Sequence, residues 1–252
     1  MKQNIITKKG TKKGTIVMIH GNSSSSNVFT PIIESNLPYS LVTFDFYGHG
    51  ESSHNGKYKL SDMKDQVLSV VDNIDDDILL IGNSLGGHIA FEVANEIKNL
   101  KGLLTFGTPP VKRPLNMEEA FIITPALNTY FTENPTEEEI ESSITTTVLD
   151  QKVIPLLKND FLKTDPKVRS VIATQVGEFS DELALLTNLD CLKFIIAGEQ
   201  DPTVNPEYLD QNKKEANYQL LKLANCGHYA SLDQPEEFNT LLKNITNQTF
   251  SL

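Results

Sequence analysis

A serine between glycines is the residue of this chain best placed to do chemistry. Residues 82–87 read Gly-Asn-Ser-Leu-Gly-Gly, so Ser84 stands in a Gly-x-Ser-x-Gly pattern. The apolar run at 77–81 predicts a buried strand before it, and apolar residues at helical spacing predict a helix at 88–97. A sharp turn between strand and helix, which small neighbours permit, leaves the serine hydroxyl exposed at the carboxyl edge of a sheet. We therefore predict that Ser84 is a nucleophile.

A serine hydroxyl needs a nearby base, usually a histidine oriented by a carboxylate. Asp201 and His228 each follow the end of a predicted strand, in the chain order serine, acid, histidine. Carboxyl ends of parallel strands meet at one edge, so Ser84, Asp201 and His228 are expected to converge on one crevice. Glu199 is an alternative acid, but Pro202 favours Asp201 because it marks the tight turn that presents this residue.

The other four histidines are weaker candidates for the base. His88 comes one helical turn after Ser84, and we expect it to pack in the core or on the surface. His49 and His54 lie in the loop after the second predicted strand, where structural hydrogen bonds are the expected role. His20 ends the first predicted strand and is interpreted as fixing the adjacent loop.

Acyl transfer also needs donors for the developing oxyanion. The backbone N–H of Leu85, directly after the nucleophile, is the first expected donor. The second is expected from Asn22, because Gly21 lets the chain turn sharply after the first strand. The serines at 23–26 are interpreted as a loop and a helix cap.

Short apolar runs alternate with helical patterns along most of the chain. The predicted strands are 15–20, 41–45, 78–81, 102–106, 194–197 and 218–223, and the predicted helices are 25–35, 61–74, 85–98, 205–215 and 235–247. Continuous apolar strands between amphipathic helices imply an α/β fold with a mostly parallel sheet and helices on both faces. Residues 4–7 suggest an edge strand paired across the turn at 8–10.

The stretch 108–189 interrupts this alternation and holds only helical patterns, near 117–131, 136–149, 151–158 and 166–178. We expect it to form a helical cap, inserted before the acid-bearing strand into a core made of 1–107 and 190–252. Phe121, Leu127 and Tyr130 belong to an apolar group that also contains Ile122, Ile123 and Phe131. They are expected either to form the packing core of the cap or to line a substrate pocket.

Composition narrows the possible partners. The formal net charge is −11, which argues against nucleic acids and anionic membranes, because phosphate binding needs clustered Lys and Arg. The first residues are polar and no apolar run approaches the length of a membrane span, so a cytoplasmic protein is expected. Cys191 and Cys226 are expected at opposite ends of the sheet, roughly 20 Å apart, as free thiols. We expect no cofactor and no metal.

These motifs together resemble the α/β-hydrolase family. The matching segments are 20–22, 45–52, 82–87, 198–202 and 227–228. Serine at position 84 separates the chain from the haloalkane dehalogenases and epoxide hydrolases, which have aspartate there. A narrower resemblance, to serine-type N-acylhomoserine lactonases, rests on 20–25, 84–89 and the Gly-Thr-Pro-Pro-Val at 107–111. The acid position departs from that pattern, because Asp201 stands where those lactonases are expected to have glutamate.

The resemblance and the residues imply a serine hydrolase that cleaves an ester or a lactone through an acyl-enzyme. N-acylhomoserine lactones, as in quorum quenching, are the hypothesised substrates, and a general short-chain carboxylesterase is the alternative. A ligand-binding protein that keeps the catalytic residues but turns over slowly is the competing class, and perhydrolase or carbon–carbon hydrolase chemistry would use the same residues. The expected partner is a small acyl ester or lactone, while the sequence does not specify an oligomeric state.

Overall fold

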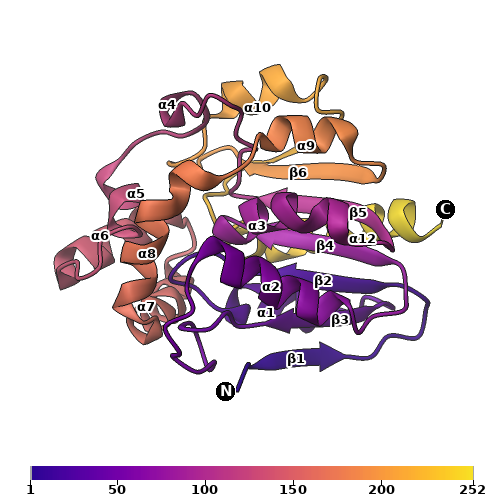
Figure 1. Ribbon diagram of the computed structural model, residues 1–252, viewed down its shortest axis with the longest axis horizontal. Coiled ribbons are helices and arrows are strands. Elements are labelled where there is room, and N and C mark those ends of the chain that lie inside the picture. Colours follow the sequence, from indigo (N-terminus) through magenta and orange to yellow (C-terminus); the bar gives the residue numbers. More distant parts are fainter. Residues whose placement is uncertain (1, 252) are drawn as a thin grey trace.

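A seven-stranded sheet organises the computed structural model, which describes residues 2–251 (Figure 1). Its order is β1-β3-β2-β4-β5-β6-β7, and every neighbouring pair is parallel except β1 with β3. The strands are β1 (Ile5–Lys8), β2 (Thr15–Ile19), β3 (Ser40–Phe44), β4 (Ile78–Asn83), β5 (Leu100–Phe106), β6 (Leu192–Gly198) and β7 (Gln219–Leu223). The fold is therefore the mostly parallel α/β arrangement that the sequence predicts.

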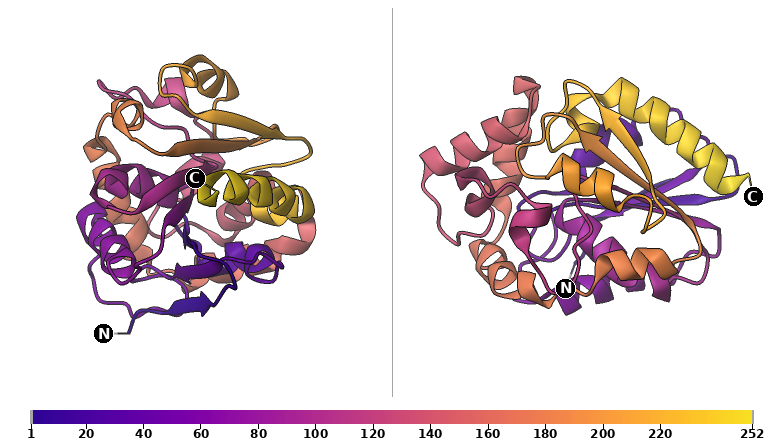
Figure 2. Two further views of the ribbon diagram at one scale, coloured as in Figure 1. Left: turned by 90° about the vertical axis from the view of Figure 1, so that its right-hand side faces the viewer. Right: turned by 90° about the horizontal axis from the view of Figure 1, so that it is seen from above.

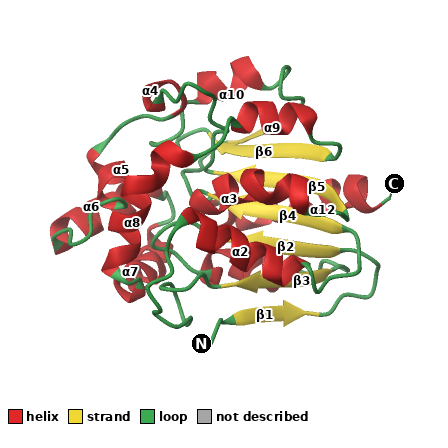
Figure 3. Ribbon diagram, viewed as in Figure 1, coloured by secondary structure: helices red, strands yellow, loops and turns green. Residues whose placement is uncertain are grey.

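Helices cover both faces of the sheet and extend beyond the carboxyl ends of its parallel strands (Figures 2 and 3). Those associated with the sheet are α1 (Thr30–Ile33), α2 (Leu60–Val71), α3 (Leu85–Val93), α9 (Glu182–Asn188), α10 (Pro206–Asn212), α11 (Ala230–Asp233) and α12 (Pro235–Phe250). Those beyond the strand ends are α4 (Met117–Ala120), α5 (Pro125–Thr129), α6 (Glu137–Thr147), α7 (Ile154–Lys163) and α8 (Pro166–Gln175). Short 3₁₀ turns are η1 (Ser26–Phe29), η2 (Ala94–Glu96), η3 (Gln151–Val153) and η4 (Val176–Glu178). None of the described helices is long and apolar enough to cross a lipid bilayer.

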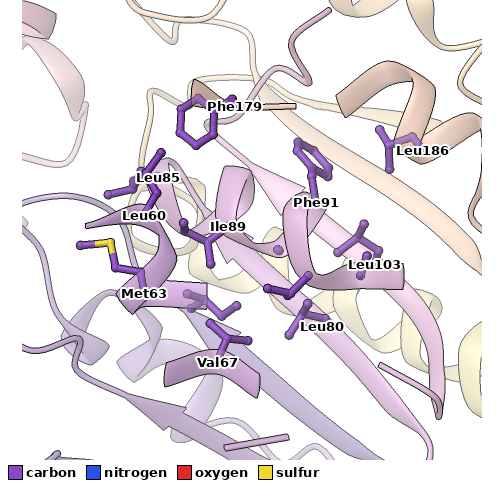
Figure 4. Close-up of a cluster of buried hydrophobic side chains, with 14 of the residues drawn as sticks. Leu60, Met63, Val67, Leu80, Leu85, Ile89, Phe91, Leu103, Phe179 and Leu186 are labelled. Atoms are coloured by element: carbon purple, nitrogen blue, oxygen red, sulfur yellow. The ribbon is translucent and has the colours of Figure 1, made fainter. Parts of the chain in front are cut away.

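Alternate residues of the buried strands point into two separate cores. On β2, Val17 and Ile19 join α2, α3 and α9, while Ile16 and Met18 join α1 and α12 on the other face. Figure 4 shows the first of these cores between α2, α3 and the sheet. Because both faces are covered, β2 is buried along its whole length, which explains its continuous apolar sequence.

The N-terminal edge strand forms, but its partner differs from the expectation. Residues 4–7 were expected to pair across the turn at 8–10, whereas β1 runs antiparallel to β3. The reason is topological: β2 has β3 on one side and β4 on the other, so no side of β2 is left for β1, which adds to the outer side of β3.

The segment between β5 and β6 contains α4 to α9 and lies largely beyond the carboxyl ends of the parallel strands (Figure 1, left). The helix expected at 117–131 is broken into α4 and α5, because Phe121 is extended and bridges Val204, and Pro125 starts a new helix. The last helix, α9, contacts α3 and so joins the layer over the sheet. The division into a core and a 108–189 cap stays a proposal.

Candidate functional site

Ser84 occupies a strained turn between β4 and α3. Its backbone has φ 53° and ψ −124°, a region that residues with a side chain rarely adopt. The Ser84 N–H donates to the carbonyl of Phe106 on the neighbouring strand, at 3.0 Å. A Cβ on Gly86 would collide with the backbone carbonyls of Ile19 and His20, so only glycine lets α3 start this close to β2. The surrounding structure therefore holds the half-buried serine in a strained conformation at the wall of a cavity.

Asp201 and His228 are brought together by the ends of β6 and β7. Asp201 Oδ2 lies 2.9 Å from His228 Nδ1. A carboxylate only accepts, so Nδ1 carries the proton and Nε2 keeps a free lone pair. Glu199, the alternative acid, is exposed and His228 is not paired with it. Tertiary structure therefore selects Asp201 over Glu199 as the partner of His228.

The Asp201 carboxylate is buried but well satisfied. Its Oδ1 accepts from the Thr203 N–H at 2.8 Å, from the Thr203 hydroxyl at 2.7 Å and from the Val204 N–H at 3.3 Å. Burial alone would raise the pKa of Asp201, but His228 and the Thr203 hydrogen bonds outweigh it and hold the pKa below its ordinary value of 3.8. The group is therefore an anion at neutral pH and can stabilise an imidazolium on His228.

Thr203 also touches the histidine and was not singled out from the sequence. Its Oγ1 lies 3.0 Å from His228 Nδ1. Because its proton goes to Asp201, the Thr203 oxygen accepts a second contact from the Nδ1–H. The available sequence signal is the Asp-Pro-Thr spacing, in which an aspartate binds the backbone two residues later.

The loop that carries His228 is fastened to the helices beyond the sheet edge by Asp233. Asp233 Oδ2 accepts from the Gly227 N–H at 2.7 Å, and its Oδ1 accepts from the N–H groups of Leu149 and Asp150 at 2.8 and 3.0 Å. The N–H of His228 itself donates to the Thr147 carbonyl at 2.9 Å. One carboxylate thus joins the histidine loop to the end of α6.

Two backbone N–H groups near Ser84 are free. Among the hydrogen bonds of residues 2–251, the N–H groups of Asn22 and Leu85 have no acceptor. Leu85 is the first residue of α3, where no intrahelical acceptor exists. Both residues line the cavity that Ser84 lines. The pair expected to bind an oxyanion is therefore placed together, with its donors unused.

A cavity over Ser84 is lined by polar side chains and by an apolar wall. Its lining includes Ser84 and His228, although no hydrogen bond joins the Ser84 hydroxyl to His228 among the described residues. Such contacts are often long before substrate binds. The apolar lining includes Phe121, Leu127, Tyr130, Phe131, Val176 and Phe179. Ile122 and Ile123 are instead exposed, at 42% and 49%.

The loop after β2 ties this cavity to the helices above it. Asn22 donates from its side chain to the Tyr130 carbonyl just after α5, at 2.5 Å, while its backbone N–H has no acceptor among residues 2–251. Ser25 and Asn27 donate to the two oxygens of Asp160 at 2.6 and 2.9 Å. The Ser25 hydroxyl also caps the 3₁₀ turn η1 by accepting the Asn27 N–H at 3.2 Å, so the serine-rich stretch forms a loop and a helix cap, as its sequence predicts.

His20 and Asp45 fix the two loops behind the site. His20 Nε2 accepts the Phe46 N–H at 3.0 Å, and its Nδ1 lies 2.8 Å from the Gly21 carbonyl. Asp45 accepts from the Ser26 N–H at 2.8 Å and the Glu51 N–H at 3.0 Å. Burial would raise the pKa of Asp45, but His20 and these hydrogen bonds leave it below its ordinary value of 3.8.

Glu182 is a buried carboxylate that sequence reasoning missed. Both of its oxygens lie 3.0 Å from His88 Nδ1, and Oε2 also accepts the Val111 N–H at 2.8 Å. Burial raises the pKa of Glu182, and the contact with His88 opposes that shift. The two residues are 94 positions apart, so no local pattern signals their pairing. His88 was expected to pack in the core or on the surface, and the structure buries it against Glu182 at the cavity wall.

Known proteins share this architecture over nearly the whole chain. A crystal structure of the N-acyl homoserine lactonase AidH, complexed with N-hexanoyl homoserine lactone, has a TM-score of 0.90 and 22% identity, covering 100% of this chain and 97% of that one. A putative aryl esterase from Burkholderia cenocepacia has a TM-score of 0.82 and 17% identity, covering 98% and 95%. At these identities the likeness establishes the fold alone.

Sequence relatives point to the same family. Protein phosphatase methylesterase 1 of Bos taurus is 31% identical over 109 residues, which are 39% of this chain and only 29% of that protein's length. The pimeloyl-[acyl-carrier protein] methyl ester esterase of Nitrosospira multiformis is 28% identical over 238 residues, covering 88% of this chain and 90% of that protein. Residues 16–241 match the sequence profile of the alpha/beta hydrolase family. The chain therefore belongs to the alpha/beta hydrolase family.

Proposed function

We propose that this protein is a serine hydrolase that cleaves a carboxylic ester or lactone through an acyl-enzyme. The observation that carries the proposal is the position of Ser84, in a strained turn on a cavity that His228, Asn22 and Leu85 also line. A nucleophile, a base held by a carboxylate and unused oxyanion donors are the parts that acyl transfer requires.

In the proposed mechanism, Ser84 Oγ attacks the acyl carbonyl carbon while His228 Nε2 removes its proton. The N–H groups of Asn22 and Leu85 bind the resulting oxyanion, and Asp201 stabilises the imidazolium. His228 then gives its proton to the departing alkoxide as the ester C–O bond breaks. Water attacks the acyl-enzyme, again with His228 as the base, and releases the acid and free Ser84. In a lactone the departing alkoxide stays attached to the acyl group, so the product is one ring-opened molecule.

We propose an N-acylhomoserine lactone as the substrate, with 108–189 acting as a cap over Ser84 and the core formed by 1–107 and 190–252. The resemblance of 107–111 to the lactonases and the apolar cavity wall at Phe121, Leu127 and Tyr130 support this choice. The Nitrosospira relative, an esterase by name, favours simple ester hydrolysis as the second candidate.

An assay of lactone ring opening, monitored through the proton that it releases, separates these two candidates. Wild-type protein is expected to open N-hexanoyl homoserine lactone with a higher kcat/KM than it shows for 4-nitrophenyl acetate. Equal or lower turnover of the lactone would contradict the lactonase assignment and leave the esterase.

A slow, receptor-like binding protein is tested separately. A fluorophosphonate probe is expected to label the wild-type protein and not Ser84→Ala, because the probe reacts only with an activated serine. Ser69→Ala, on α2 away from the cavity, is the matched control and should label like wild type. A wild-type protein that resists labelling would contradict the hydrolase proposal.

A further inference from the structure

His88 places a second polar group close to the proposed nucleophile. It lies in the first turn of α3, and its N–H donates to the Ser84 carbonyl at 3.3 Å. One turn of helix, about 5.4 Å, therefore separates the two residues along the axis. His88 is 6% exposed and lines the same cavity as Ser84.

The orientation of the His88 ring is fixed from two sides. Glu182, fully buried, holds Nδ1 with both carboxylate oxygens at 3.0 Å. The ring of Phe179 stacks on the imidazole with centroids 4.7 Å apart and planes at 25°. A ring that is held by a carboxylate and a stacked aromatic has its second nitrogen aimed in one direction.

That second nitrogen has no partner in the protein. Nε2 of His88 makes no hydrogen bond with residues 2–251. Solvent can reach this nitrogen, whereas Nε2 of His49 is sealed from solvent. His88 lines the cavity and its Nε2 is within reach of solvent, so we infer that this nitrogen faces the cavity. The rings of Phe121 and Phe179 lie beside it, so an apolar acyl chain there would leave this nitrogen unsatisfied at a cost in free energy.

We propose that His88 Nε2 hydrogen-bonds a polar substituent on the acyl side of the scissile ester. The site then selects acyl groups with an amide or hydroxyl one or two carbons from the carbonyl. An amide or a hydroxyl can both donate and accept a hydrogen bond. It can therefore pair with Nε2 whether the His88 ring is neutral or protonated. The inference rests on the proposed function of Ser84 and names the substrate feature that the site reads.

Two esters with the same chain length test this inference. 4-Nitrophenyl N-acetylglycinate and 4-nitrophenyl pentanoate share a leaving group and an acyl chain of the same length, but only the first carries an amide. The readout is the ratio of their kcat/KM values, in which intrinsic reactivity and any general loss of activity cancel between variants. In His88→Phe, which keeps an aromatic ring for Phe179, the ratio should fall about tenfold, the worth of one good hydrogen bond.

A control variant and a rescue variant separate specificity from folding. Ser69→Ala, at an exposed position of α2 outside the cavity lining, should leave the ratio within about twofold of wild type. His88→Phe leaves the buried Glu182 carboxylate without its histidine partner, so the double variant H88F/E182Q is measured beside it. This double variant removes the buried charge and keeps an acceptor for the Val111 N–H.

The outcomes distinguish the inference from the function on which it rests. A fall in the ratio in a folded His88 variant supports the inference. Wild-type turnover of both esters, with a ratio that is unchanged in both His88 variants, overturns the inference and leaves the proposed function standing. If the wild type hydrolyses neither ester, the inference and the proposed function are both overturned.

Discussion

Replacing Asp201 with asparagine alters its contact with His228 at one atom. Oδ1 of Asp201 accepts three hydrogen bonds from Thr203 and Val204, and an asparagine oxygen can keep all three. The change falls on the other oxygen, 2.9 Å from His228 Nδ1. An asparagine NH₂ there donates, so Nδ1 must become the acceptor and the ring proton moves to Nε2. A protonated Nε2 has no lone pair to take the proton from Ser84.

The expected loss is large because both functions of the carboxylate disappear together. The wrong tautomer removes the base, and the lost anion removes stabilisation of the imidazolium. In a serine protease of unrelated fold with the same Ser-His-Asp arrangement, this replacement lowers kcat about 10⁴-fold, which is about 5 kcal/mol of transition-state stabilisation. The fold should be nearly unaffected, since the three hydrogen bonds to Oδ1 remain.

The assay is kcat/KM for a 4-nitrophenyl ester, with thermal unfolding measured on the same samples. Glu199→Gln is the matched control, because it removes an exposed carboxylate from the same loop. We expect Glu199→Gln to stay within about twofold of wild type, as surface substitutions usually do. A folded Asp201→Asn variant that loses less than about tenfold, or a large loss in Glu199→Gln, would refute the assignment of the acid.

Three other variants probe the framework around the site. Gly86→Ala should destabilise the fold by about 1–3 kcal/mol in urea unfolding, because its Cβ meets backbone carbonyls, whereas Gly177→Ala, with open space around its Cβ, should not; equal effects would contradict the close approach. Asp233→Asn should lower both the melting temperature and kcat, because an NH₂ group would face the Gly227 N–H. An unchanged kcat in a folded variant would mean that the contact between Asp233 and Gly227 does not position the loop of His228. Asp45→Asn should be less stable than wild type at pH 7. Because the folded-state pKa of Asp45 lies below 3.8, the wild-type advantage should persist above that pH and vanish as pH falls through the folded value, and a gap constant down to pH 3 would show otherwise.

The pairing of distant charged residues explains where sequence reasoning reached its limit. Ser84, Asp201 and His228 were predictable because each follows a strand, and a parallel sheet must bring the strand ends to one edge. Glu182 and His88 have no such rule, since helix α9 meets α3 only through packing. The same applies to the contacts of Asp233 with Leu149 and Asp150, which lie more than 80 residues earlier.

The sequence by itself determined the sheet, the order of its helices and the residue types at the strand ends. The spacing of apolar residues and the residue types of turns are local properties of the sequence. The run 78–83 with its glycine therefore specifies a strand and a sharp turn without help from the rest of the chain. Only the tertiary structure decided that Asp201 and not Glu199 faces His228, that β1 pairs with β3, and that His88 meets Glu182 at the cavity wall. These outcomes depend on which surfaces meet when the helices pack, and that is fixed by contacts between residues far apart in the sequence.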